Sequence, residues 1–275
     1  MKKLTSILDI GIPSPIKVIH FSDTHLTRAD GRDDERKIKL AKQRRIGPFP
    51  DNEAIYTETL ALAAEGYDAV LHTGDLIDFV SYANLEEAEN FVRTTDCFFA
   101  AGNHEFSLYV GEAKEDAAYR EQSLKRVQAS FGNDIRFDSR IVGGINFVAI
   151  DNSYYLFEKF QLDLLKKEVE KGLPIVLLMH NPIYEEGLYE YMMSKSPCAY
   201  LVAAPDEKIS GYPADRREQQ RADEITLRTV EFIKNEPLIK AILCGHIHKD
   251  FESDIAVGKP QMAVGLKTAR EILIK

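Results

Sequence analysis

The chain carries Gly74-Asp75-Leu76-Ile77-Asp78 directly after an apolar run at residues 69–73. Such a run is typical of a strand that is buried on both faces of a parallel sheet. Gly74 permits the backbone to turn sharply where that strand ends. We therefore expect Asp75 at the carboxyl end of the strand, which is where open α/β sheets bind their ligands.

The composition limits the classes of protein to which the chain can belong. Its 275 residues, of which 44% are hydrophobic, suffice for a large α/β core, and neither a linker nor a repeat is evident. We therefore predict a single domain over residues 1–275. The net charge of −9 argues against a broad nucleic-acid surface, so nucleic acid is not an expected partner.

The sequence also predicts a cytoplasmic protein without a membrane partner. No run approaches the roughly 18 apolar residues that a membrane span requires. Asp9 interrupts the apolar stretch near the start, which favours a mature N-terminus over a signal peptide. Cys97, Cys198 and Cys244 are scattered, which is typical of buried thiols in a reducing compartment. No pattern indicates an oligomeric state.

Apolar runs alternate with helical patterns over most of the chain. Strands are expected at residues 16–22, 69–73, 97–101, 145–150, 174–179 and 239–244. Helices are expected at residues 53–65, 85–93, 114–131, 161–171 and 216–234. Segment 26–51 is polar and ends in Gly47-Pro48-Phe49-Pro50, which cannot continue a helix. Segment 183–213 is expected to be irregular, and the tail after His248 to form short antiparallel strands. This order favours a sheet with helices and a second sheet packed on it.

Possible metal ligands follow five of the expected strands. They are Asp23 with His25, Asp75, Asn103, His180, and His246 with His248. Carboxylate, amide and imidazole groups together are typical of sites for Mn, Fe or Zn. Seven ligands are more than one ion can use while leaving room for substrate, so they favour two ions that share a carboxylate. Ions in such pairs lie about 3.5–4 Å apart and act on both the attacking and the leaving oxygen of a displacement.

These ligands fall into five blocks whose order resembles the signature of the calcineurin-like metallophosphoesterase family. The blocks are Asp23-x-His25, Gly74-Asp75-x-x-Asp78, Gly102-Asn103-His104-Glu105, His180, and Gly245-His246-x-His248. The match extends over positions 23–248. It implies an α/β fold, an αββα sandwich of two mixed β-sheets flanked by helices, with a dinuclear metal centre.

The resemblance also implies a role for each matching residue. One ion would be held by Asp23, His25, Asp75 and His248, and the other by Asp75, Asn103, His180 and His246. His104 would be the catalytic histidine beside the leaving group, and Asp78 would orient its ring. The implied reaction is phosphoester hydrolysis, in which a metal-bridging hydroxide attacks phosphorus and His104 gives a proton to the leaving oxygen.

Two features of the sequence bear on the substrate. Asp78 is followed by Phe79-Val80, whereas the protein serine/threonine phosphatase branch of the family has Arg-Gly there. No extra domain of the kind that the nuclease branch uses to grip DNA is evident after His248. Both favour a small phosphomonoester or phosphodiester. The alternatives are a nuclease, a cyclic-nucleotide phosphodiesterase, and a non-catalytic scaffold of the same fold.

Other polar segments have open interpretations. Residues 28–45 are rich in Arg and Lys, and they form either a solvated face or a lid that contacts phosphate. Four tyrosines at residues 184–200 form either a wall of the substrate pocket or surface packing. His20 and His72 lie inside expected strands, so we interpret them as core residues or as neighbours of the metal ligands. Asp151-Asn152 matches no block of the signature and is assigned a structural role.

Overall fold

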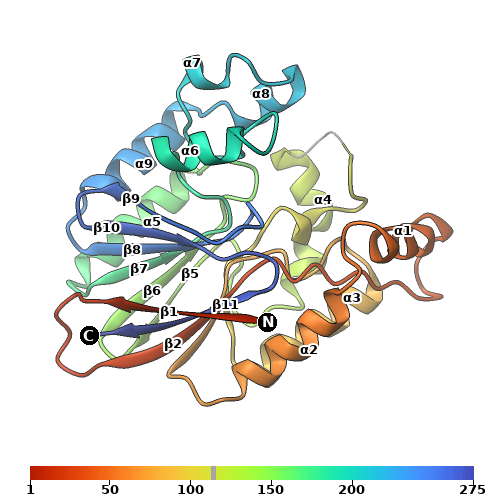
Figure 1. Cartoon of the computed structure of the whole chain (residues 1–275), viewed down its shortest axis with the longest axis horizontal. Helices are drawn as coiled ribbons and strands as arrows, with labels where there is room; N and C mark the ends of the chain where they lie inside the picture. The colour runs from red at the N-terminus through yellow and green to blue at the C-terminus, as the bar shows by residue number, and fades with distance from the viewer. Residues whose placement is uncertain (113–115) are drawn as a thin grey trace.

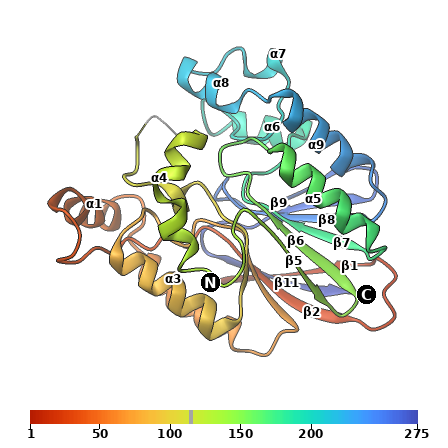
Figure 2. The same cartoon turned by 180° about the vertical axis from the view of Figure 1, so that it is seen from behind.

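Two mixed β-sheets lie face to face in the computed structural model, which describes residues 1–112 and 116–275 (Figure 1). The first sheet has five strands in the order β1-β11-β2-β3-β4, and the second has six in the order β5-β6-β7-β8-β10-β9. Helices cover the outer faces of both sheets (Figure 2). The predicted αββα sandwich is therefore confirmed.

Most neighbouring strands run parallel. The first sheet contains β1 (Lys2–Leu8), β11 (Thr268–Ile274), β2 (Ile16–Phe21), β3 (Ala69–His72) and β4 (Phe98–Phe99). The second contains β5 (Phe137–Val142), β6 (Ile145–Ile150), β7 (Ile175–Leu178), β8 (Ile239–Cys244), β10 (Lys259–Ala263) and β9 (Phe251–Ala256). The pairs β2–β3, β3–β4, β6–β7 and β7–β8 are parallel, so the loops after these strands leave the sheets in one direction.

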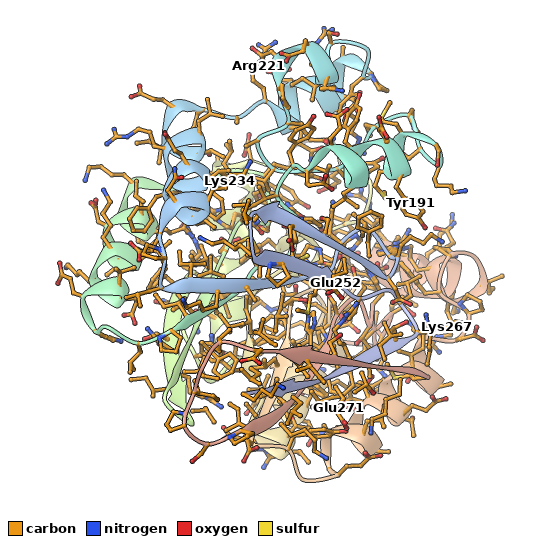
Figure 3. All side chains as sticks on the ribbon, turned by 60° about the vertical axis from the view of Figure 1, so that its left-hand side comes forward. Tyr191, Arg221, Lys234, Glu252, Lys267 and Glu271 are labelled. Atoms are coloured by element: carbon orange, nitrogen blue, oxygen red, sulfur yellow. The ribbon has the colours of Figure 1, made fainter. Side chains whose placement is uncertain are left out.

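The helices divide into those that cover a sheet and those that lie in the loops. The first sheet carries α2 (Asn52–Ala63), α3 (Tyr82–Thr95) and α4 (Ala117–Gln128), and the second carries α5 (Lys159–Glu170) and α9 (Glu224–Asn235) (Figure 1 and Figure 2). The loops contain α1 (Glu35–Ile46), the 3-10 helix η1 (His104–Phe106), α6 (Glu186–Met193), α7 (Asp206–Ile209) and α8 (Ala214–Gln220). Tyr191 of α6, labelled in Figure 3, packs on Phe251 of β9, with 5.2 Å between the ring centroids.

The core has an apolar layer between the sheets and another beneath each set of helices. Val18 of β2 packs with Phe147 of β6 between the sheets, whereas the next residue, Ile19, packs with Phe91 of α3. Successive residues of a strand point to opposite faces, which places them in different layers. Leu165 of α5 belongs to the third layer. Burial of each such side chain stabilises the fold by about 1.5–3 kcal/mol.

Two segments for which no helix was predicted contain helices. α1 lies within residues 26–51, and the side chain of Asp34 caps it by accepting a hydrogen bond from Lys37 N. Only Lys37 and Ala41 of α1 are buried, so the segment has no apolar stripe from which to predict a helix. Within residues 183–213, α6 begins where Glu185 accepts hydrogen bonds from the backbone N–H groups of Gly187 and Leu188.

Other boundaries also differ from the expectation. The helix expected at residues 216–234 is two helices, α8 and α9, because Asp223 caps a new helix by accepting from Thr226 N at 2.7 Å. The helix expected at residues 114–131 is α4, and residues 114 and 115 lie outside the described residues. The strand expected at residues 97–101 is limited to Phe98–Phe99. The helices expected at residues 53–65, 85–93 and 161–171 are present as α2, α3 and α5.

The two ends of the chain meet in the first sheet. β1, which was not predicted, pairs in parallel with β11, and β11 pairs antiparallel with β2. Of the tail, only the β9–β10 hairpin and the β11–β2 pair are antiparallel, since β10 is parallel to β8. Among the described residues, no helix has the length and apolar character needed to cross a membrane.

Candidate metal centre

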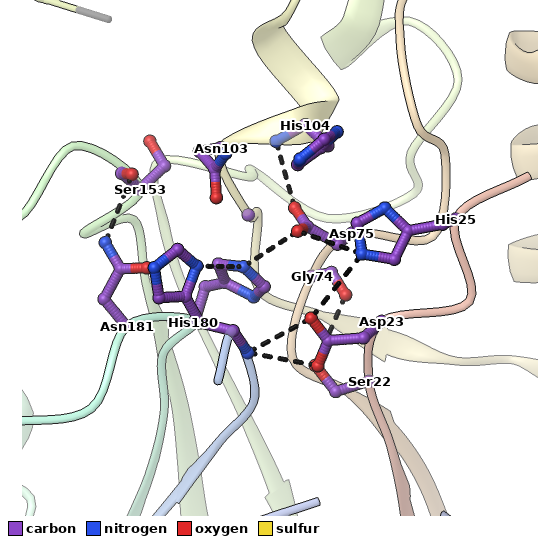
Figure 4. Close-up of polar contacts among 12 residues, drawn as sticks. Ser22, Asp23, His25, Gly74, Asp75, Asn103, His104, Ser153, His180 and Asn181 are labelled. Atoms are coloured by element: carbon purple, nitrogen blue, oxygen red, sulfur yellow. Dashed lines mark hydrogen bonds and ion pairs between the residues drawn. The ribbon is translucent and has the colours of Figure 1, made fainter. Parts of the chain in front are cut away.

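The predicted ligands lie together at one edge of the two sheets, and Figure 4 shows Asp23, His25, Asp75, Asn103 and His180 around one centre. β2 is followed by Asp23 and His25, β3 by Asp75, β4 by Asn103, β7 by His180, and β8 by His246 and His248. Parallel strands end at the same edge of a sheet, so ligands that are far apart in the sequence converge. Among them, Asp23, His25, Asp75 and His180 are almost completely buried.

The backbone is left-handed at five of the seven predicted ligands. The φ angles are 57° at Asp23, 50° at His25, 55° at Asp75, 67° at His246 and 55° at His248. Such angles are uncommon for residues other than glycine, and they cluster at functional sites where the surrounding structure holds them. Each angle turns the chain sharply just after a strand, which directs the side chain back toward the cluster. This signal of a functional site cannot be recognised in the sequence.

Two glycines let the loops after β3 and β4 approach each other. Gly74 has a φ of +94°, and a Cβ added there would lie 2.4 Å from the backbone N of Gly102. A Cβ at Gly102 would in turn lie 2.2 Å from Oδ1 of Asp75. Because no side chain fits at either position, the Asp75 carboxylate lies directly against the loop that carries Asn103 and His104.

A first group of donors consists of Asp23, His25, Asp75 and His248. One ligand atom from each lies within 4.8 Å of all the others. The Nε2 atoms of His25 and His248 are 3.0 Å apart, and His248 Nε2 is 3.4 Å from Oδ1 of Asp23. Nδ1 of His25 lies 3.1 Å from Asp78 Oδ1, an acceptor, so it carries the ring hydrogen and leaves a lone pair on Nε2.

A second group consists of Asp75, His180 and His246, again within 4.8 Å of one another. Nδ1 of His180 donates to the Thr73 carbonyl at 2.6 Å, which leaves the lone pair of Nε2 for an ion. That Nε2 is 3.1 Å from Oδ2 of Asp75 and 3.2 Å from Nδ1 of His246. Oδ2 of Asp75 is also 3.5 Å from Nε2 of His25, so one oxygen atom is common to both groups.

Asn103 lies beside the second group. Its Oδ1 is buried and has no hydrogen-bond partner among the described residues, and the side chain points toward the His180 side of the cluster (Figure 4). A buried amide oxygen without a partner is costly, and a cation would satisfy it. The Nε2 atoms of His25 and His180, whose ring hydrogens are held on Nδ1, likewise offer lone pairs to a cation. The donor atoms therefore fit a pair of metal ions.

The electrostatics of the cluster are those of paired opposite charges. Burial raises the pKa of Asp75, but the His180 and His104 charges outweigh it and hold that pKa well below its usual range. Burial lowers the pKa of His180, but the Asp75 charge reverses this and raises it to about 9. Metal ions would take the place of the protons that these imidazoles carry, because a metal ligand must be deprotonated.

His104 lies beside the first and second donor groups and is a member of neither. Its backbone N–H donates to Oδ1 of Asp75 at 2.9 Å, and its Nδ1 is 2.7 Å from the carbonyl oxygen of Asp78 and 3.1 Å from Asp78 Oδ1. Both neighbours of Nδ1 are acceptors, so Nδ1 carries a hydrogen. Burial lowers the pKa of His104, but the charges of Asp75 and Asp78 outweigh it and raise the pKa to about 10.

Arg44 and Phe49, which the sequence analysis did not single out, contact Asp78 and His25. Arg44 of α1 donates to both carboxylate oxygens of Asp78, from Nε at 2.6 Å and from Nη2 at 2.8 Å. Phe49 stacks on the His25 ring with 4.1 Å between centroids and an interplanar angle of 11°. Arg44 belonged to a segment noted only for its charge, and an isolated Phe carries no signal of a site.

Glu105 belongs to the Gly102-Asn103-His104-Glu105 block but had no assigned role. Its buried carboxylate accepts four backbone hydrogen bonds, from Asp75 at 2.7 Å, Gly102 at 2.7 Å, Leu76 at 2.8 Å and Ile77 at 3.2 Å. Glu105 thus joins the loop after β4 to the loop after β3. Burial, together with the Asp75 charge, raises the pKa of Glu105 to about 7.

The second sheet supplies further contacts that support the ligands. The Tyr155 hydroxyl lies 2.8 Å from Nε2 of His246. Oδ1 of Asn152 accepts hydrogen bonds from the backbone N–H groups of His180 at 3.1 Å and Asn181 at 3.0 Å. Asp151 forms ion pairs with Arg120 and Arg136, so the structural role assigned to Asp151-Asn152 fits these contacts.

The segments with open interpretations take different positions. Within residues 28–45, Arg28 and Arg32 pair with acidic side chains away from the centre, and Arg44 reaches Asp78. Of the four tyrosines, Tyr200 lies near the centre, with its ring 5.9 Å from that of His246. The buried ring of His20 contacts the Thr73 hydroxyl, and that of His72 contacts the Thr24 hydroxyl, just behind the ligands.

Comparison with known proteins agrees with this geometry. A model of the calcineurin-like phosphoesterase family matches residues 16–250. The chain is 22% identical over 241 residues to 3',5'-cyclic adenosine monophosphate phosphodiesterase CpdA of Vibrio vulnificus (strain CMCP6), an alignment that covers 86% of this chain and 70% of that protein.

The solved structures that resemble the chain are distant in sequence. Purple acid phosphatase PPD1 from yellow lupin (Lupinus luteus) seeds has a TM-score of 0.52 at 14% identity, over 92% of this chain. The chain spans only 44% of that phosphatase, so this likeness concerns the fold alone. A dimetal phosphatase from Danio rerio has a TM-score of 0.49 at 13% identity, over 91% of this chain and 88% of that protein.

The family model covers most of the chain, and residues 16–250 include both donor groups as well as Asn103 and His104. The chain therefore belongs to the calcineurin-like phosphoesterase family, whose members are metal-dependent phosphoric ester hydrolases.

Proposed function

We propose that this chain is a dinuclear metal-dependent phosphoesterase that hydrolyses a small phosphomonoester or phosphodiester. One observation carries the proposal: a single oxygen, Oδ2 of Asp75, lies 3.5 Å from Nε2 of His25 and 3.1 Å from Nε2 of His180. These imidazoles belong to different donor groups, so the carboxylate is positioned to be shared by two ions.

Two sets of residues that share Asp75 would hold the two ions. The first ion would be held by Asp23, His25, Asp75 and His248, and the second by Asp75, Asn103, His180 and His246. When bound, two ions such as Mn, Fe or Zn supply Lewis-acid stabilisation of the phosphoryl oxygens and lower the pKa of water. The buried neighbours of the ligands, Thr73 and Asp78, keep the ring hydrogens on Nδ1 of His180 and His25.

His104 is proposed as the residue that acts on the leaving group. Its Nδ1 hydrogen is held by Asp78, so the other ring nitrogen is the one that can transfer a proton to the leaving oxygen. The charges of Asp75 and Asp78 favour the protonated ring, which supports a role as general acid or as a positive charge beside the transition state. Asp78 would fix the ring and need not bind an ion.

A cyclic-nucleotide phosphodiesterase is the second candidate within the same chemistry. It is favoured by the 22% identity to a curated protein named as a 3',5'-cyclic adenosine monophosphate phosphodiesterase. This reaction also breaks one phosphorus–oxygen ester bond, so the same residues would serve it. A nuclease is disfavoured by the net charge of −9. The cytoplasmic location stays a prediction.

A metal and substrate panel tests the proposal. Purified protein would be stripped with chelator and reloaded with Mn, Fe or Zn, and its metal content measured by elemental analysis. Turnover would then be assayed with a mono-aryl phosphate, a bis-aryl phosphate, cyclic AMP, single-stranded DNA and a set of phosphorylated metabolites. Asp75→Asn, purified in parallel, controls for contaminating phosphatases.

The expected result is close to two ions per chain and metal-dependent turnover of small phosphoesters that the Asp75→Asn protein lacks. Turnover of the bis-aryl ester and cyclic AMP without the mono-aryl ester would exclude the monoesterase and select the phosphodiesterase. Protein that binds no stoichiometric metal and stays inactive with every ion would overturn the proposal and favour a non-catalytic scaffold.

A further inference from the structure

Helix α1 contacts the catalytic region through its last turn. It lies in the segment between β2 and β3, and Figure 1 shows it projecting from the edge of the two-sheet body. Arg44, three residues before Gly47 ends the helix, donates to Asp78 Oδ2 from Nε at 2.6 Å and to Asp78 Oδ1 from Nη2 at 2.8 Å. The Arg44 side chain is 20% exposed, whereas Asp78 is completely buried.

The two carboxylate oxygens of Asp78 contact three side chains. Its Oδ1 lies 3.1 Å from Nδ1 of His25 and 3.1 Å from Nδ1 of His104, and it also accepts from Arg44. A carboxylate that is free to rotate could favour one imidazole over the other. The planar guanidinium binds both oxygens at once, so it fixes the rotation of the carboxylate as well as its charge.

A second contact keeps Arg44 in place. Its guanidinium lies 4.9 Å from the ring centroid of Phe49, and that ring stacks on His25. The turn after α1 is thus packed between the guanidinium and an imidazole of the first donor group. Asn52, at the start of α2, holds the same region by donating to the His25 carbonyl at 2.7 Å. Arg44 therefore has a fixed position and not that of a mobile surface cation.

We propose that Arg44 is a positioning residue for phosphoester hydrolysis. It fixes the Asp78 carboxylate with Oδ1 3.1 Å from Nδ1 of His104, and this charge, together with the hydrogen bond from Nδ1 to the Asp78 carbonyl at 2.7 Å, holds the His104 ring toward the leaving group. The inference rests on the proposed function, because it assigns Arg44 to the reaction that His104 serves. Arg44 acts through Asp78 and His104 and does not itself contact the substrate.

The test compares three variants. Arg44→Met removes the guanidinium but keeps a long apolar side chain against Phe49. Arg44→Lys keeps one positive charge without the paired donors. Arg45→Met is the matched control, since Arg45 lies next in the same helical turn and contacts the Thr27 carbonyl and Glu53 instead of Asp78. Each would be assayed at saturating metal with aryl phosphates of graded leaving-group pKa.

Arg44→Met should lower kcat by about 10- to 100-fold, the usual effect of losing a group that orients a catalytic residue, and leave KM near the wild-type value. The loss should grow as the leaving group becomes poorer, because those esters depend most on His104. Arg44→Lys should recover part of the rate, and Arg45→Met should retain it. In a His104→Ala background, Arg44→Met should cause only a small further loss, because His104 is gone and only the contact of Asp78 with His25 remains to be affected.

A second readout is independent of turnover. In the metal-free wild-type protein, the Nδ1 hydrogen of His104 should give a slowly exchanging NMR signal, assigned by its absence from His104→Ala. Arg44→Met should broaden or remove this signal, and Arg45→Met should keep it. If Arg44→Met does not fold, the comparison of Arg44→Lys with the wild type carries the same test.

Three outcomes would overturn the inference. They are an unchanged kcat with an intact His104 signal, a rise in KM at constant kcat, which would mean direct substrate binding, and a full additional loss in the His104→Ala background. These outcomes require an active wild-type enzyme. Failure of the proposed function would instead appear as a wild-type protein without metal-dependent turnover, so the two failures are distinguishable.

Discussion

The carboxylate of Glu105 accepts a hydrogen bond from the backbone N–H of Asp75 at 2.7 Å. The same buried side chain accepts from Leu76, Ile77 and Gly102. One carboxylate thereby fixes the backbone from which the shared ligand projects, and it binds that backbone to the loop carrying His104. The position of Asp75 depends on Glu105 although Glu105 is not itself a proposed ligand.

Glu105→Gln should therefore destabilise the protein without changing its shape. The amide NH2 of Gln would face backbone N–H groups that need an acceptor, and each buried donor left unsatisfied costs about 1–3 kcal/mol. Urea unfolding, monitored by circular dichroism, should give a free energy of unfolding that is lower by at least about 1–3 kcal/mol, the cost of one unsatisfied donor. Glu218→Gln, at an exposed position, is the control and should match the wild type. Equal stability of both variants would contradict the role assigned to Glu105.

Gly74→Ala should destabilise the protein more than Gly66→Ala. Both glycines have a positive φ, +94° and +84°, but a Cβ at Gly66 meets no atom within 4 Å. Gly66→Ala should cost only the strain of a left-handed residue, about 1–2 kcal/mol. Gly74→Ala adds an overlap with the Gly102 backbone, for a total of about 2–5 kcal/mol. Thermal unfolding of both variants measures the difference, and similar melting temperatures would rule out the close approach.

We expect Asp75→Asn to remove the metal ions, whereas Asp78→Asn should lower the rate and keep the ions. Asp75 contributes to both donor groups, so Asp75→Asn should lose both ions and fall to background turnover. Asp78 contacts ring hydrogens and Arg44, so Asp78→Asn should keep close to two ions while kcat falls by about 10- to 100-fold. Elemental analysis and steady-state kinetics at saturating metal distinguish the two. An Asp75→Asn protein that still holds two ions would refute the shared carboxylate.

His104→Ala should keep both metals and lose turnover. Removing a general acid typically costs about 100- to 10,000-fold in rate, and the loss should be greatest for poor leaving groups. A plot of log kcat against the pKa of the leaving group should be steeper for the variant than for the wild type. His20→Ala, which removes an imidazole behind the ligands that no donor group includes, controls for general loss of a buried histidine. A His104→Ala enzyme with wild-type turnover would exclude His104 from the reaction.

The convergence of the ligands could be predicted because it follows from a simple rule. Asp75 and His180 each follow an apolar run, and parallel strands place their carboxyl ends at one edge. The sequence therefore indicated which side chains meet, and the structure brings them together. The rule does not predict the backbone conformation between the end of a strand and the ligand that follows it. The left-handed φ of 55° at Asp75 depends on contacts with Glu105 and Gly102, which are distant in the sequence.

The supporting contacts could not be predicted for a related reason. Arg44 lies in a helix that has almost no buried apolar residues, so its charge indicated only a solvated face or a lid that contacts phosphate. Its role depends on one tertiary contact with Asp78. Tyr155 reaches His246 in the same manner, from a loop with no periodic pattern. Propensity and periodicity report on local structure, whereas these roles arise from pairs of residues that are distant along the chain.

The position of β11 has a consequence for how the protein is made. β1 pairs only with β11 in the described sheet, and one edge of β2 pairs only with β11 as well. While the chain emerges from the ribosome, β2 therefore carries an unpaired edge until residues 268–274 have been synthesised. Unpaired edges favour association with other chains, and contacts between such distant residues slow folding. The first sheet is thus completed only after β11 has been synthesised, and β2, the strand that Asp23 follows, gains its second neighbour only then.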